Sequence, residues 1–141
     1  MNKVLGLDLG TVTLGIAKSD SLGFVHGVET FRFDKNQYIV ARKHVYDLCK
    51  SLEINEIALG LPLRLNQSES EMSMIVRRFK DDLEKEHPEL KITLVDERLS
   101  SVSAHNALSM NGVNHQTRMQ KVDMYAACII LETYIGMKGN K

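Results

Sequence analysis

The chain has 141 residues, a length that suits one domain, and we expect a single domain over residues 1–141. Its 18 basic and 18 acidic side chains cancel to zero net charge, which excludes the overall basic character typical of nucleic-acid-binding proteins. Its 2 isolated cysteines exclude a disulfide framework, and no apolar run approaches the ~20 residues of a membrane span, so we expect a cytoplasmic protein.

The N-terminal residues predict a β-hairpin with an acid in its first strand. Along residues 3–10, leucines alternate with Asp8 and small residues, so Asp8 lies on the face opposite the leucines. Residues 10–13 can make the turn, and residues 14–18 have the pattern of a returning strand. An ionised carboxylate in an apolar strand needs hydrogen bonds, a basic partner or a metal ion. Asp8 is therefore either a structural acid or a ligand-binding acid, and this stretch favours neither.

The remaining chain alternates strands and helices. In order, we expect a strand over 23–31, a helix over 36–52 and a strand over 56–62. A second helix should begin with a capping box of Ser68 and Glu71 and end at Pro88. A strand over 91–95, a helix over 100–110 and a last helix that residues 118–121 lead into complete the chain. We expect the first three strands to form an antiparallel meander. The two later strands, which are joined through helices, should lie parallel in the same sheet. The expected fold class is α/β, a mixed five-stranded sheet flanked by helices.

Acidic residues stand where a site is expected in such a sheet, beyond the carboxyl ends of its parallel strands. Asp96 and Glu97 close one such strand and point in opposite directions, so only one of them can face Asp8. Asp123 shares a face of the last helix with two alanines. Taken singly, each of these acids is explained by a structural role without a functional site. Asp123 would complement the helix dipole, and Asp96 and Glu97 would pair with Arg98.

Convergence of three acids would change this interpretation. Two carboxylates about 4 Å apart repel by about 4 kcal/mol at an effective dielectric constant of ~20, so three in one cleft need protons, basic partners or a divalent cation. Carboxylates and water suit Mg²⁺ or Mn²⁺, and one or two such ions can activate water and neutralise charge on a phosphoryl group. The candidate catalytic and metal-binding residues are Asp8, Glu97 and Asp123.

Several polar residues are candidates for contacts with a nucleic-acid backbone. They lie in the first turn, in the loop after residues 60–62, after the last strand and before the last helix: Thr11, Asn66, Arg98, Arg118 and Lys121. The basic residues can hold a backbone if they share a face, whereas such charges more often form a solvated surface.

A set of short motifs resembles the YqgF family, whose members are described as pre-16S rRNA nucleases or RuvC-like Holliday junction resolvases. The matching motifs are Gly6-Leu7-Asp8-Leu9-Gly10-Thr11, Gly15-Ile16-Ala17, Ser19-Asp20, Gly60-Leu61-Pro62-Leu63, Asp96-Glu97-Arg98-Leu99-Ser100, and Asp123 with Ala126-Ala127 and Ile130-Leu131. They span almost the whole chain in order, and the set is specific where one motif alone would be weak.

The resemblance implies a ribonuclease H-like fold, a divalent-metal site for phosphodiester hydrolysis and a role in maturing the 5′ end of 16S ribosomal RNA. By this resemblance, Asp8 matches the family's acid in the first strand, Glu97 the acid of the Asp-Glu-Arg motif and Asp123 the acid of the last helix. The sequence departs from the family at residues 12–14, which lack its usual basic residues, and at residues 66–68, which lack its usual glycine.

The leading interpretation is therefore a metal-dependent nuclease acting on structured pre-ribosomal RNA, as a monomer or weak homodimer. One alternative is a Holliday-junction-type DNA resolvase with the same acids, so branched DNA remains a second partner. Another is a nucleic-acid-binding module without catalysis, which the missing basic residues favour. The segment Asp8-Leu9-Gly10-Thr11 also resembles the phosphate loop of the actin and sugar-kinase superfamily, whose members need two such domains around the nucleotide.

Overall fold

The computed structural model describes residues 2–63, 70–97 and 115–139, and within the last range it describes side chains from Val122 to Lys138. The helix expected over 100–110 lies outside the described residues. No helix within the described ranges combines the length and the apolar character needed to cross a bilayer.

Five strands form one mixed sheet, as the sequence predicted. They are β1 (Val4–Leu9), β2 (Thr13–Ser19), β3 (Val25–Arg32), β4 (Glu56–Leu61) and β5 (Lys91–Asp96). Their order across the sheet is β3-β2-β1-β4-β5. β1 pairs antiparallel with β2 and β2 with β3, whereas β4 lies parallel to both β1 and β5. The hairpin strand β1 therefore becomes the central strand, with a neighbour on each side.

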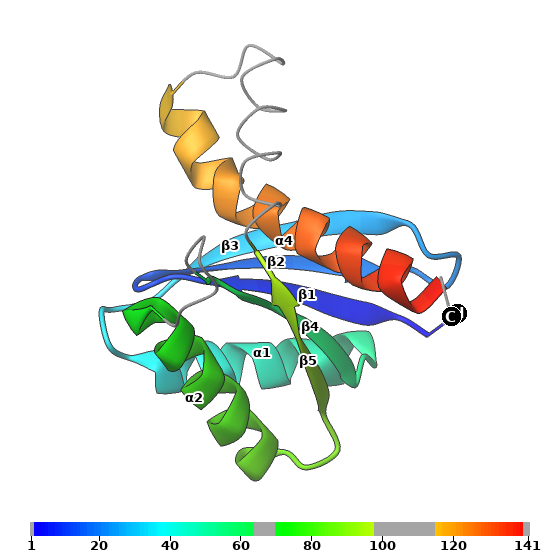
Figure 1. Cartoon of the computed structure of the whole chain (residues 1–141), viewed down its shortest axis with the longest axis horizontal. Helices are drawn as coiled ribbons and strands as arrows, with labels where there is room; N and C mark the ends of the chain where they lie inside the picture. The colour runs from blue at the N-terminus through cyan, green and yellow to red at the C-terminus, as the bar shows by residue number, and fades with distance from the viewer. Residues whose placement is uncertain (1, 64–69, 98–114, 140–141) are drawn as a thin grey trace.

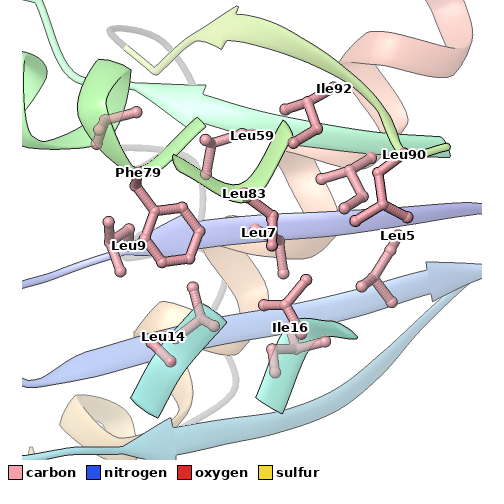
Figure 2. Close-up of a cluster of buried hydrophobic side chains, with 14 of the residues drawn as sticks. Leu5, Leu7, Leu9, Leu14, Ile16, Leu59, Phe79, Leu83, Leu90 and Ile92 are labelled. Carbon is pink, nitrogen blue, oxygen red and sulfur yellow. The ribbon is translucent and has the colours of Figure 1, made fainter. Parts of the chain in front are cut away.

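Helices cover both faces of this sheet (Figure 1). Helices α1 (Tyr38–Leu52) and α2 (Glu71–Glu86) cover one face, and α4 (His115–Gly139) crosses the other. The predicted alternation in β1 explains this layering, because its leucines pack against Phe79 and Leu83 of α2 (Figure 2). On the other face, Val4 joins a smaller cluster with residues of α4, among them Ala127 and Leu131. Asp8 alternates with the leucines and so belongs to the α4 face.

The start of α2 differs from the prediction. A capping box of Ser68 with Glu71 is wrong, since the helix is capped by Ser70. The Ser70 hydroxyl accepts a 3.0 Å hydrogen bond from the Ser73 amide, and the Ser73 hydroxyl accepts one of 2.8 Å from the Ser70 amide. A serine three residues into the helix thus takes the part that glutamate usually plays, because its short side chain is buried and reaches back to the cap.

Candidate functional site

The central acid of the site is Asp8, near the carboxyl end of β1. It is partly buried and stands opposite Gly15 of β2, on the sheet face that α4 covers. Gly15 has no side chain to separate sheet and helix: a Cβ there would lie 1.9 Å from the backbone oxygen of Asp123. The contact between β2 and α4 therefore depends on glycine at this position, and it brings the helix close to Asp8.

Glu97 follows β5 and faces the same side. Its amide donates a 3.1 Å hydrogen bond to the carbonyl of Leu61, which continues the pairing of β5 with β4 by one residue. Its side chain is buried, and the missing Cβ of Gly60 makes room for it, since that atom would lie 2.7 Å from Glu97 Cδ. Asp96 is exposed, as the expected alternation requires.

Asp8 and Glu97 are hydrogen-bonded to each other, with protonated Glu97 donating to the Asp8 carboxylate. Burial raises the pKa of Asp8; the bond from Glu97 opposes this and the charge of Asp123 adds to it. Burial likewise raises the pKa of Glu97, which the bond to Asp8 and the charges of Asp8, Asp123 and Asp96 raise further. The pair therefore retains a proton at pH values where isolated carboxyl groups have lost theirs.

Asp123 of α4 is the third acid, and it is held from the sheet. The hydroxyl of Thr13 in β2 donates a 2.7 Å hydrogen bond to Asp123 Oδ2. The charge of Asp123 contributes to the raised pKa of both Asp8 and Glu97, so the three groups interact across one site. Sequence reasoning missed Thr13 as a site residue, because no local signal connects residues 110 positions apart.

The donor set suits a hard divalent cation, although the described side chains are not gathered around one. Among the described residues, no group of three His, Cys, Asp or Glu side chains is arranged to hold a metal ion. Instead Glu97 donates to Asp8, and Asp123 accepts from Thr13. A cation can nevertheless replace the proton that Asp8 and Glu97 share, since a carboxylate must be deprotonated to bind a metal ion. The three acids therefore fit Mg²⁺ or Mn²⁺ by ligand chemistry.

The predicted nucleic-acid contacts are described only in part. Thr11 is exposed in the turn between β1 and β2. Asn66 and Arg98 lie outside the described residues, and Arg118 and Lys121 lie in the first turns of α4, where side chains are not described.

This sheet order, with acids on the central strand, after β5 and on the last helix, defines a protein of ribonuclease H-like fold. RuvC of T. thermophilus in complex with a Holliday junction substrate has the same fold: the TM-score is 0.61 at 14% identity, covering 98% of this chain and 97% of RuvC. The yeast mitochondrial Holliday junction resolvase superposes with a TM-score of 0.56 at 9% identity, covering 98% of this chain and 79% of the resolvase.

The family follows from sequence comparison. The model of the family described as "RuvX: Holliday junction resolvase" matches residues 2–137, and the chain therefore belongs to the RuvX (YqgF) family. A relative from Geobacillus sp. (strain WCH70), named "Putative pre-16S rRNA nuclease", is 36% identical over 137 residues, which cover 96% of this chain and 99% of the relative. The resemblance inferred from the sequence motifs is thereby confirmed.

Proposed function

We propose that this protein is a metal-dependent nuclease that hydrolyses phosphodiester bonds of structured RNA during processing of the 5′ end of pre-16S ribosomal RNA. The observation that carries the proposal is the hydrogen-bonded pair of partly buried Asp8 and buried Glu97, with Asp123 beside it on one sheet face. Burying acids in mutual contact costs stability, so their presence together favours a functional role. The name of the Geobacillus relative supports RNA as the substrate.

The three acids share one role in this proposal, and Thr13 supports it. Asp8, Glu97 and Asp123 would hold one or two divalent cations, which when bound supply Lewis acidity toward the phosphoryl group and an activated water. To serve as a ligand, Glu97 would release to solvent the proton that it donates to Asp8. Thr13 holds the Asp123 carboxylate in one orientation through its hydroxyl, the task of residues that support metal ligands.

Cleavage of branched DNA is the second candidate, and the RuvC likeness favours it. RuvC matches nearly the full length of this chain and was solved with a Holliday junction. The same acids would serve an RNA or a DNA backbone, so a comparison of RNA cleavage with branched-DNA cleavage decides the substrate. A nucleic-acid-binding module without catalysis would bind RNA and cleave neither substrate.

The deciding experiment is calorimetric titration with Mn²⁺, combined with cleavage assays on pre-16S RNA and on a four-way DNA junction. We expect saturable Mn²⁺ binding and metal-dependent RNA cleavage in the wild type, with both lost in Asp8→Asn. Asp47→Asn is the matched control, because Asp47 is an exposed acid on α1, across the sheet from the site. The proposal fails if the wild type does not cleave RNA, or if Asp8→Asn behaves like Asp47→Asn.

A further inference from the structure

Arg32 is a cationic side chain placed beside the acidic site by the strand register. It is the last residue of β3 and stands directly opposite Thr13 of β2, and Thr30 stands opposite Gly15. The β-bulge in this pair lies between Ile16 and Ala17, so the register from Thr13 to Ile16 is continuous. Directly opposed residues of an antiparallel pair share a face, with Cβ atoms about 4.5–5.5 Å apart.

Neighbouring side chains fix the direction in which Arg32 points. Phe31 and Phe33 belong to the hydrophobic cluster on the other face of the sheet, with α1 and α2. The Phe33 amide donates a 3.0 Å hydrogen bond to the carbonyl of Val12, so the ordered pairing extends past Arg32. Alternation then places Arg32 on the face of Thr13, whose hydroxyl binds Asp123.

The Arg32 guanidinium is available for a ligand. The side chain is exposed, and no ion pair or hydrogen bond joins it to another residue within the described part of the chain. Arg42 on α1 is different, since it makes hydrogen bonds of 3.0 and 3.2 Å to Glu86 of α2. Among the described residues Arg32 is thus a cation without an ion-pair partner, and it lies at the margin of a cluster of three acids.

A cation at this position can offset the repulsion between the acidic site and the phosphate backbone of a nucleic acid. A polyanionic backbone approaching Asp8, Glu97 and Asp123 meets like charge, and residues 12–14 of the adjoining turn carry no basic side chain. A guanidinium at the margin can form two parallel hydrogen bonds to one phosphate and offset this repulsion. We propose that Arg32 binds a backbone phosphate of the RNA substrate beside the acidic site, an inference that depends on the proposed nuclease function.

The test compares RNA affinity across salt concentrations for Arg32→Ala, Arg32→Lys and Arg78→Ala. An Asp8→Asn background keeps the RNA intact, and a fragment of pre-16S RNA is the probe. Arg78→Ala is the matched control, because Arg78 is an exposed arginine on α2, across the sheet from the acids. Arg32→Ala should weaken binding about tenfold and reduce the slope of log K against log salt by roughly 1. Arg32→Lys should restore the slope and part of the affinity, since lysine keeps the charge without the planar fork.

Cleavage kinetics with Asp8 restored separate this inference from the nuclease function. We expect Arg32→Ala to raise KM with little change in kcat, because a phosphate contact made in ground and transition states alike contributes uniform binding. If the wild type binds and cleaves RNA but Arg32→Ala keeps the salt slope of Arg78→Ala, the Arg32 inference is wrong and the nuclease function stands. If the wild type neither binds nor cleaves RNA, the nuclease function fails and the Arg32 inference fails with it.

Discussion

The Thr13 hydroxyl and the Asp123 carboxylate, 110 positions apart in the chain, are joined by a 2.7 Å hydrogen bond. This bond connects the second strand of the sheet to the last helix at the edge of the acidic site. It also occupies one oxygen of Asp123, so the orientation of that carboxylate depends on a residue outside the three acids.

Thr13→Val should therefore impair catalysis more than stability. Loss of the hydroxyl leaves Asp123 free to rotate, and loss of a group that orients a metal ligand costs roughly 10–100-fold in metal affinity or activity. The loss of one hydrogen bond costs about 1 kcal/mol of unfolding free energy. Thr13→Ser keeps the hydroxyl and is the control. Equal Mn²⁺ affinity and equal cleavage rates for Thr13→Val and the wild type would contradict this role.

Gly15→Ala should loosen α4 from the sheet. The added Cβ would lie 1.9 Å from the backbone oxygen of Asp123, a distance that requires the helix to move. Overpacking of this kind costs about 3 kcal/mol, which lowers the melting temperature by roughly 10 °C in a chain of this size. Gly136→Ala is the matched control, because an added Cβ there meets nothing within 4 Å and alanine favours a helix. A thermal melt of Gly15→Ala that matches the Gly136→Ala melt would show that the close approach is not required.

The faces of the elements were predictable because side-chain periodicity determines them. Alternation in β1 separated Asp8 from its leucines, and the same rule at residues 96–97 left one acid to face Asp8. Helical spacing placed Asp123 with buried Ala126 and Ala127, as the structure has it. These signals are local and need no knowledge of strand order.

The contacts between elements were not predictable from local patterns. Nothing near Thr13 indicates that its hydroxyl meets Asp123, and nothing near Gly60 indicates that Glu97 occupies the space above it. Both depend on the register of neighbouring strands and on where α4 crosses the sheet. The convergence of the acids likewise rested on the family resemblance, since spacing along the chain does not measure distance.

Glu97→Gln should abolish cleavage and stabilise the fold. Burial, foremost, raises the pKa of Asp8 and Glu97 above their ordinary values of 3.8 and 4.5, so at higher pH the folded state binds more protons than the unfolded chain. Stability therefore falls as pH rises from about 4.5 toward the raised pKa values. Glutamine keeps a donor toward Asp8 without a proton to lose. In EDTA at pH 8 we expect a gain of about 1–2 kcal/mol, or roughly 3–8 °C in melting temperature.

Melting curves between pH 5 and 8 test whether the stability of the fold falls as the pH rises. The wild type should lose stability across this window and Glu97→Gln should lose less, whereas Asp47→Asn should follow the wild type. A lower melting temperature for Glu97→Gln than for the wild type at pH 8 would mean that the ionised pair is not a source of instability.

A second buried acid, Glu56 at the start of β4, should stabilise the protein with the opposite pH dependence. Burial alone would raise the pKa of Glu56, but hydrogen bonds from Lys138 and Tyr134 of α4 outweigh it, and the pKa lies below the ordinary 4.5. The contribution is therefore complete above pH 4.5 and is lost as pH falls through the lowered value. Tyr134→Phe removes one of these bonds and should cost about 1 kcal/mol at pH 7.

The comparison of Tyr134→Phe and Lys138→Gln with the wild type at pH 7 and pH 3 tests this contribution. Both variants should melt lower than the wild type at pH 7, and the differences should shrink as the pH falls through the lowered pKa of Glu56, because the protonated carboxyl group is a weaker acceptor. Lys43→Gln is the control, since Lys43 is an exposed lysine whose pair with Asp47 on α1 contributes little. β4 and β5 are parallel, so Glu56 at the start of β4 and Glu97 after the end of β5 lie at opposite ends of the strand pair. The two variants should therefore cleave RNA like the wild type at a temperature where they remain folded. A difference that grows at pH 3 would contradict the lowered pKa of Glu56.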